Sequence, residues 1–528
     1  MISKAALYWR TIRHLRTVQI VDRVTRRLRP RPAVPGIAPP PRAPVFELDA
    51  ALVKPRSFLG PRDFRFLGEE RAIESGRGWY APGASRLWTY NLHYFEGLAN
   101  PDTSERLKRQ IVGDWIESNP PGVGAGWEPY PTSQRIVNWI KWVARASDVP
   151  IGFDLSLCRQ VRYLERYLEF HLLGNHLFAN AKALTAAGLY FRGDTADRWR
   201  RRGEAILESE LGEQFLPDGG HFELSPVYHA LLTEDLLDLL SLYRAYGFEG
   251  PVTLGAVAER AMEWLAVMTG PDGHPALFND AALGVASTHA ALAEKADRLG
   301  VRAMTAPARG TRFLEASGYV RHDEDRYALI ADVGPIGPDY IPGHGHCDML
   351  SVVVWQADRP LLVDTGTSTY EVGARRLIER STSSHNTVQI GSYEQSEVWG
   401  SFRVARRAEL LEVSVSPGVV RAAARIVPAR PVVHRRLIEC RSRTLSIVDT
   451  LERVVNEPDA VARFHFHPDA EPSLSEGRVT AGSAVLSFEG ADAVSLRPYE
   501  YAPRFNTRVP AQRVEVRFRD RLRTEITL

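Results

Sequence analysis

The sequence of 528 residues contains few cysteines and no long hydrophobic run. Its three cysteines, Cys158, Cys347 and Cys440, lie far apart and form no CxxC pair, so we predict neither a disulfide framework nor a cysteine zinc knuckle. No apolar run is long enough to cross a bilayer, and no transmembrane segment is expected. The first 30 residues lack the apolar core and small-residue cleavage site of a secretory signal. The sequence therefore predicts a cytoplasmic protein, unless an unrecognised route exports it to the periplasm or the medium.

An excess of one charge is also absent, since 66 lysines and arginines face 64 aspartates and glutamates, for a net charge of +2. This balance excludes a strongly basic nucleic-acid-binding surface, and no nucleic-acid partner is expected. Arginine far outnumbers lysine. Arginine suits bidentate recognition of carboxylate or sulfate groups, but a GC-rich genome explains the same usage. Composition alone leaves these two explanations equal.

Residues 1–45 are expected to form an N-terminal appendage of two parts. Residues 1–30 place apolar side chains at helical spacing opposite arginines, which is typical of an amphipathic surface helix. We expect this helix to dock on its own domain, with contact to a membrane surface as the alternative. Residues 29–44, RPRPAVPGIAPPPRAP, are rich in proline and predict a stiff linker.

The rest of the chain is too long for one core and divides into two domains by its hydrophobic pattern. Over residues 46–310 the dominant pattern is helical, with successive segments from about residue 86 that carry apolar residues at i, i+3, i+4 and i+7. Over residues 311–528 the segments are short, alternating and β-branched, with turn residues between them. The sequence therefore predicts an all-helical domain followed by an antiparallel sheet domain.

Histidines gather in the sheet domain. In GHGHCDMLS, His344 and His346 are two residues apart, so an extended backbone projects them to the same side. Asp364 follows in VDTG and His385 in SSHNTV. Imidazole, carboxylate and imidazole on neighbouring strands are typical of a divalent-metal site, although each residue alone is better explained as a hydrogen-bonded polar group at a strand end.

Three segments of the helical domain combine polar and aromatic residues: GWEPYPTSQRIVNWIKW, GNHLFANAKAL and DGGHFELSPVYHA. Each has a purely structural explanation. Asn175 suits a helix N-cap, Pro226 suits a helix start, and the tryptophans suit a hydrophobic core. The functional alternative is a sugar-binding cleft in which Arg135 pairs with an acidic group. The segments taken singly do not decide between these explanations.

Taken together, these segments, with LFNDA and the run GHGHCDMLSVVVW…PLLVDTGTSTY…RSTSSHNTVQI, resemble the heparinase II/III family of polysaccharide lyases. The resemblance covers roughly residues 85–400. It implies a two-domain α+β protein in which an incomplete (α/α) toroid is followed by an antiparallel β-sandwich. It also implies β-elimination at a uronate, which leaves a 4,5-unsaturated sugar. The expected partner is an acidic polysaccharide, either glycosaminoglycan or heparin-like, or a bacterial exopolysaccharide.

The resemblance also assigns catalytic roles. Asn175 matches the asparagine that neutralises the uronate carboxylate, with His176 beside it as a second candidate. Tyr228 matches the tyrosine that acts as the acid, and as the base for one C5 epimer. His344 matches the histidine that is the other base. These residues come from both domains, so the resemblance predicts an active site in the interdomain cleft.

The same resemblance assigns His346, Asp364 and His385 to one divalent metal ion of mainly structural role. Zn²⁺ is the expected metal, with Mn²⁺ and Ca²⁺ as alternatives. Contacts with the substrate are expected from four further residues: Trp127, Arg135, Trp139 and Glu223.

Two other functions remain open on the sequence. A glycoside hydrolase on the same toroid needs a pair of carboxylates about the scissile bond, for which Asp218, Glu223 and Asp280 are candidates. A glycan-binding protein of exopolysaccharide assembly needs no acid or base. The sequence leaves open the exact polysaccharide and the oligomeric state, for which a dimer is one alternative.

Overall fold

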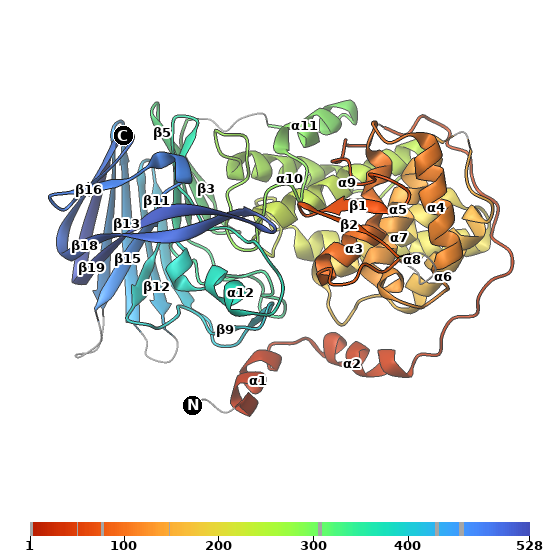
Figure 1. The fold of residues 1–528 in the computed structure, drawn as a ribbon, viewed down its shortest axis with the longest axis horizontal. Coiled ribbons are helices and arrows are strands. Elements are labelled where there is room, and N and C mark those ends of the chain that lie inside the picture. Colours follow the sequence, from red (N-terminus) through yellow and green to blue (C-terminus); the bar gives the residue numbers. More distant parts are fainter. Residues whose placement is uncertain are drawn as a thin grey trace.

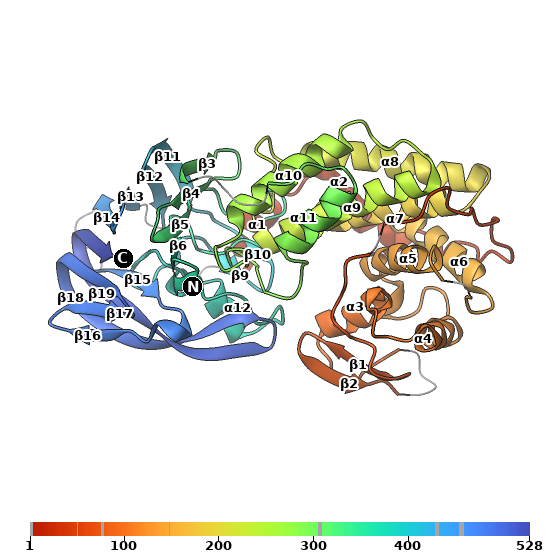
Figure 2. The ribbon, with the colours of Figure 1, turned by 90° about the horizontal axis from the view of Figure 1, so that it is seen from above.

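The computed structural model describes residues 4–49, 51–74, 79–146, 148–304, 309–427, 432–452 and 459–528. Helices occupy one end of the molecule and sheets the other, and an N-terminal segment runs along one side of both (Figure 1). The view from above shows the same division, with helices stacked in pairs (Figure 2). The predicted class is confirmed: an incomplete (α/α) toroid precedes an antiparallel β-sandwich.

The toroid is built from successive antiparallel helices that pack side by side. They are α3 (Arg86–Tyr94), α4 (Glu105–Ser118), α5 (Pro129–Val143), α6 (Phe153–Arg166), α7 (Gly174–Tyr190), α8 (Asp194–Gln214), α9 (Pro226–Tyr246), α10 (Leu254–Met268) and α11 (His289–Arg298). Helix α7 is almost entirely buried because it is rich in alanine and glycine. A Cβ at Gly188 would lie 2.5 Å from the backbone nitrogen of Arg200, so the absence of a side chain lets α7 and α8 approach closely.

The change from helix to strand falls between α11 and β3, and the sandwich continues to the C-terminus. One sheet contains β3 (Gly310–Leu314), β4 (Tyr319–Asp323), β5 (Tyr327–Asp332), β6 (Val352–Gln356) and β7 (Arg359–Leu362) in that order. The other contains β8 (Val388–Ile390), β11 (Glu409–Ser416), β12 (Val419–Ile426), β13 (Val432–Arg441), β14 (Thr444–Glu452), β15 (Ala460–His465), β16 (Ser473–Ser475), β17 (Arg478–Ala481), β18 (Ala484–Arg504) and β19 (Thr507–Thr527). Buried side chains of the two sheets form one core, as in Leu329 and Val514.

The two domains are joined by buried contacts. Trp264 of α10 packs with Tyr319 and Trp355 of the first sheet in one cluster. The long hairpin of β18 and β19 reaches back towards the helices (Figure 1), where the backbone nitrogen of Leu283 donates to Pro503 at 2.7 Å. The two domains therefore meet through elements of both.

Three smaller elements complete the fold. A hairpin of β1 (Asp63–Phe66) and β2 (Glu69–Ala72) precedes the first toroid helix. Helix α12 (Ala374–Glu379) lies in the loop after β7, and β9 (Val398–Trp399) pairs with β10 (Arg403–Val404). The N-terminal segment carries α1 (Lys4–Ile12) and α2 (Thr17–Thr25). Within the described part of the chain, no helix is both long enough and apolar enough to cross a membrane.

Candidate active site

The candidate site lies where the first turn of α9 meets the loop that carries the two histidines. Pro226 starts α9, and the hydroxyl of Ser225 accepts a hydrogen bond from the backbone nitrogen of Tyr228 at 3.3 Å, which caps the helix. The cap fixes Tyr228 in the first turn. Its ring stacks on the imidazole of His344 with centroids 3.9 Å apart. A residue of the toroid and a residue of the sandwich domain are thereby brought into direct contact.

His344 is held from two sides by carboxylates of the toroid. Its Nδ1 lies 2.9 Å from Oδ2 of Asp280, a hydrogen bond. Its Nε2 lies 3.3 Å from Oε2 of Glu223, which is an ion-pair distance but lacks the alignment of a hydrogen bond among the described residues. Because Nδ1 is hydrogen-bonded to Asp280, Nε2, which lies beside Glu223, is the ring nitrogen left as a candidate base.

Asp280 is the centre of a buried charge network. Its two carboxylate oxygens accept hydrogen bonds from both terminal nitrogens of Arg376, which come from α12. His346 Nε2 also contacts Asp280 Oδ1 at 2.9 Å. Burial alone would raise the pKa of Asp280, but Arg376 and the hydrogen bonds from His344 and His346 outweigh it and lower that pKa well below the ordinary value. Asp280 is therefore an anion that fixes both histidines.

Asn175 lies in the first turn of α7 and is linked to the site through Glu223. Its backbone nitrogen donates to Oε1 of Glu223 at 3.2 Å, so Glu223 bridges Asn175 and His344. Gly174 makes this approach possible, since it has φ +55° and a Cβ there would lie 2.7 Å from Glu223 Oε1. Burial raises the pKa of Glu223. Glu223 is only 2% exposed, so it supports the neighbouring residues of the site. The expected direct contact between Glu223 and a sugar is therefore not formed by this buried side chain.

His176 points towards a different partner. Its Nδ1 contacts Oε1 of Glu169 at 3.2 Å, and its ring lies 4.5 Å from the ring of Tyr130. Burial would lower the pKa of His176, but Glu169 raises it overall. His176 thus lies beside Asn175 and is paired with Glu169, which favours its protonated form.

Tyr228 also contacts an aromatic residue of the sandwich domain. Its hydroxyl lies 3.3 Å from the hydroxyl of Tyr370. Burial, together with Tyr370 and Asp280, raises the pKa of Tyr228 well above its ordinary value. Tyr228 is therefore protonated at neutral pH and can give a proton to an oxygen in the cleft.

The predicted metal ligands lie behind His344. His385 Nδ1 is 2.6 Å from Asp364 Oδ2, and the rings of His346 and His385 are 5.3 Å apart. Two buried nitrogens, His346 Nδ1 and His385 Nε2, have no hydrogen-bond partner among the described residues. Asp348 is close by, and burial raises its pKa to about 6, with a further increase from Asp364. Orphaned imidazole nitrogens next to crowded carboxylates fit a bound cation.

The geometry of a complete metal site is not formed by these side chains. Among the described residues, no group of three histidine, cysteine, aspartate or glutamate side chains is arranged to hold a metal ion. Histidine and aspartate are suitable ligands for a divalent metal ion, but these side chains do not converge on one point.

Three expected substrate contacts lie in the helical core and must be corrected. Arg135 is completely buried, donates to Gln160 Oε1 at 2.8 Å and stacks on Trp115 at 3.9 Å. Trp127 and Trp139 are buried in the same core. Their apolar spacing on and before α5 suits a hydrophobic core equally well, so the pattern could not separate the two explanations.

Sequence reasoning missed three residues of the site. Arg376, Tyr370 and Phe402 surround His344, with the rings of Tyr370 and Phe402 at 6.4 Å and 5.8 Å from it. Asp280 was considered only as an acid of a hydrolase. The segment LFNDA, which contains Asp280 and belongs to the family resemblance, was the one available signal.

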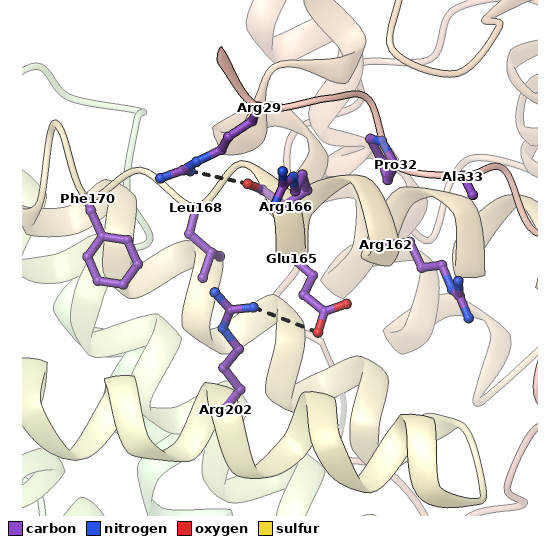
Figure 3. A pocket seen from close by; sticks show the side chains of 9 residues that line it. All are labelled: Arg29, Pro32, Ala33, Arg162, Glu165, Arg166, Leu168, Phe170 and Arg202. Atoms are coloured by element: carbon purple, nitrogen blue, oxygen red, sulfur yellow. Dashed lines mark hydrogen bonds and ion pairs between the residues drawn. The ribbon is translucent and has the colours of Figure 1, made fainter. Parts of the chain in front are cut away.

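A cavity of about 450 Å³ lies apart from this site, where the N-terminal segment crosses α6 and α8 (Figure 3). It is lined by Arg29, Pro32, Ala33, Arg162, Glu165, Arg166, Leu168, Phe170 and Arg202. Glu165, the acidic member, accepts a hydrogen bond from Trp199 at 3.1 Å and lies 3.8 Å from Arg202. This cavity is basic, but it contains none of the residues that surround His344.

The fold and the site together define a toroid-plus-sandwich protein with a histidine–tyrosine pair where its two domains meet. The family model of the heparinase II/III N-terminus matches residues 107–298 of this chain. The family model of the heparinase II/III-like C-terminal domain matches residues 306–528. The chain therefore belongs to the heparinase II/III family.

Among curated relatives, the heparin-sulfate lyase of Pedobacter heparinus is 26% identical over 192 residues, which are 33% of this chain and 29% of the relative. The heparin-sulfate lyase of Bacteroides stercoris is 34% identical over 113 residues, or 21% of this chain and 17% of the relative. The matched segments thus span less than a third of these relatives.

Solved structures match over much more of the chain. The crystal structure of heparinase III has a TM-score of 0.72 at 17% identity and covers 97% of this chain and 89% of that one. The chondroitin AC lyase of Streptomyces coelicolor A3 has a TM-score of 0.52 at 8% identity, with 90% and 77% covered. At these identities the match establishes the fold alone.

Proposed function

We propose that this protein is a polysaccharide lyase that cleaves uronate-containing acidic polysaccharides by β-elimination and leaves 4,5-unsaturated uronate ends. The observation that carries the proposal is the stacking of His344 on Tyr228, with Asn175 joined to the same pair through Glu223. The family membership and the heparin-sulfate lyases among the relatives support the same reaction.

The proposed reaction removes a proton from C5 of a uronate and expels the oxygen at C4. The C5 proton is weakly acidic, so the adjoining carboxylate must be neutralised or hydrogen-bonded as charge develops. Asn175 is the proposed donor to that carboxylate, with His176 beside it. His344 is the proposed base through Nε2, since Asp280 occupies Nδ1. Tyr228 is the proposed acid for the leaving oxygen, since its raised pKa keeps the hydroxyl protonated, and it is also the proposed base for the other C5 epimer.

We further propose one divalent metal ion, Zn²⁺ with Mn²⁺ or Ca²⁺ as alternatives, held by His346, Asp364 and His385. The two orphaned nitrogens of His346 and His385 support it. When bound, the ion would neutralise the carboxylates behind the cleft and hold the histidine loop in place. In this proposal the ion does not touch the sugar.

The proposed substrate is an acidic glycan of the heparan sulfate type or a bacterial exopolysaccharide. The test offers heparan sulfate, hyaluronan, chondroitin, alginate and bacterial capsules separately and follows the ultraviolet absorbance of the unsaturated product. A glycoside hydrolase would release reducing ends without that absorbance, and a glycan-binding protein would release neither.

The role of the two catalytic side chains is tested by Tyr228→Phe and His344→Ala. Each is expected to reduce elimination by about 10²–10⁴-fold, the usual contribution of a general acid or base. Tyr340→Phe serves as the matched control, because this tyrosine pairs with Glu213 outside the cleft. Near-normal elimination by both cleft variants would refute the assignment.

A further inference from the structure

The N-terminal helix α2 is oriented with its polar side inwards. Its buried residues are Gln19 and Asp22, whereas Val21 and Val24 are more than half exposed. Leu28, one turn further, is 80% exposed. The helix therefore does dock on its own chain, but the apolar stripe that normally faces a core faces outwards instead.

Polar contacts to both domains fix this orientation. The side-chain amide of Gln19 donates to the carbonyl of Tyr340 at 3.3 Å, and Asp22 accepts from the backbone nitrogen of His171 at 3.1 Å. In α1, Arg10 forms an ion pair with Glu397 of the sandwich domain at 2.7 Å. Rolling the helices inwards would break these hydrogen bonds and the ion pair, so the contacts favour the outward orientation of the stripe.

The apolar stripe continues onto α1, where Trp9 is 64% exposed. We define the outer face of this segment by its exposed large apolar side chains: Tyr8, Trp9, Ile12, Val18, Ile20, Val21, Val24 and Leu28. Scattered exposed apolar residues are ordinary, but so many on two short successive helices point to an interaction surface, although the ring of Tyr8 also packs edge-on against Trp399.

Basic residues predominate around the outer face, although Arg10 is paired with Glu397 and Arg16 with Glu213. Residues 4–31 contain nine basic residues: Lys4, Arg10, Arg13, Arg16, Arg23, Arg26, Arg27, Arg29 and Arg31. The single acidic residue in that stretch is Asp22, which is buried and paired with Arg29. The cavity of Figure 3, which begins at Arg29, adds three more arginines and one glutamate from the toroid. The surface that covers the outer face must therefore be both apolar and negatively charged.

We propose that α1 and α2 dock the protein onto an anionic lipid surface, with the outer face in the headgroup region and the arginines against acidic headgroups. An amphipathic helix with aromatic and aliphatic residues on one side and arginines on the other is suited to lie in a membrane interface. A second copy of the chain is disfavoured, since it would bring two arginine-rich segments together. An acidic glycan would attract the arginines but would gain nothing from Val24 and Leu28.

The test uses the full chain with sedimentable vesicles of phosphatidylcholine alone or mixed with phosphatidylglycerol. We expect binding to the anionic vesicles that weakens in high salt, and little binding to the neutral ones. The double variant Val24→Ser/Leu28→Ser should lower the affinity by about tenfold or more. The matched control is Ile151→Ser/Val252→Ser, which removes two apolar side chains elsewhere that are even more exposed, at 96% and 100%.

Three results would overturn the proposal. Equal loss of binding in both double variants would mean that the outer face has no special role. Binding that survives Val24→Ser/Leu28→Ser would assign the attraction to the arginines alone. Self-association in the absence of lipid, lost in the same variant, would make a second copy the occupant. All the altered side chains are exposed and lie outside the proposed catalytic set, so an unchanged circular dichroism spectrum and turnover without vesicles show that each variant is folded.

Discussion

Replacing Asp280 with asparagine is the sharpest test of how the site is held together. The carboxylate of Asp280 and the guanidinium of Arg376 are both fully buried, and the two oxygens of Asp280 also hold His344 and His346. Removal of one partner from a buried ion pair generally costs about 3–5 kcal/mol, because the other charge remains uncompensated. Asparagine keeps one acceptor oxygen, and Arg376 keeps the carbonyl of Ser401 at 2.9 Å. We therefore expect a loss near the lower end, about 3 kcal/mol.

Asp280→Asn should also impair turnover, because His344 loses the anion that fixes its Nδ1 proton and its orientation. A displaced base loses most of a general base's contribution of about 10²–10⁴-fold. Asp280 acts through His344, so it is a positioning residue, and the pH dependence of kcat/KM should shift together with the loss of rate. Asp280→Glu should restore part of the charge and part of the activity.

The sandwich domain offers a matched control in Asp449. This buried carboxylate likewise accepts from an arginine, Arg436 at 2.7 Å, and from a histidine, His434 at 2.7 Å. Asp449→Asn should cost a similar free energy of unfolding, measured by urea denaturation, while elimination by the folded protein stays near normal. Equal loss of activity in both variants would refute the positioning role, and an unchanged stability of Asp280→Asn would refute the account of the buried pair.

Three other predictions concern stability. Arg135→Lys is expected to lower the melting temperature and leave KM unchanged, because this guanidinium lies in the core; a raised KM without loss of stability would contradict that. Removal of metal by a chelator should lower the melting temperature, and His385→Ala should abolish that response. Burial lowers the pKa of His93 to about 3 and of His229 to about 4, so the unfolded chain binds more protons below about pH 6.5. Stability should then fall from pH 6.5 towards pH 4, by up to about 1.4 kcal/mol per pH unit for each histidine, and His93→Asn should flatten the slope of unfolding free energy against pH.

The architecture was predictable because it depends on local pattern. A repeat of 3.6 residues marks each toroid helix, and alternation of β-branched residues marks the sandwich strands, so the change near residue 300 is visible in the sequence. The direction of α2 was not predictable. Its sequence shows that one side is apolar, but whether that side faces inwards depends on distant partners such as His171 and Tyr340.

The site was predictable only where one segment carries several functional residues. GHGHCDMLS identifies His344 and His346 at once, and the family resemblance adds Asn175 and Tyr228. Asp280 precedes His344 by 64 residues and belongs to the other domain, so no spacing rule links them. Arg135 was wrongly predicted to contact the substrate for a different reason. A residue next to tryptophans suits a hydrophobic core and a sugar-binding site equally well.

The two histidines of GHGHCDMLS lie in different surroundings, but both contact the carboxylate of Asp280. His344 faces the cleft, whereas His346 is buried, with Nε2 on Asp280 and Nδ1 without a partner among the described residues. One imidazole thus joins the carboxylate that orients the proposed base to the proposed metal position. A metal ion on Nδ1 would strengthen donation by Nε2 to Asp280 and so stiffen the support of His344. Loss of the ion should therefore reduce turnover through a displaced base, with a smaller effect than His344→Ala, because Glu223 and the ring of Tyr228 still hold His344 from its other sides.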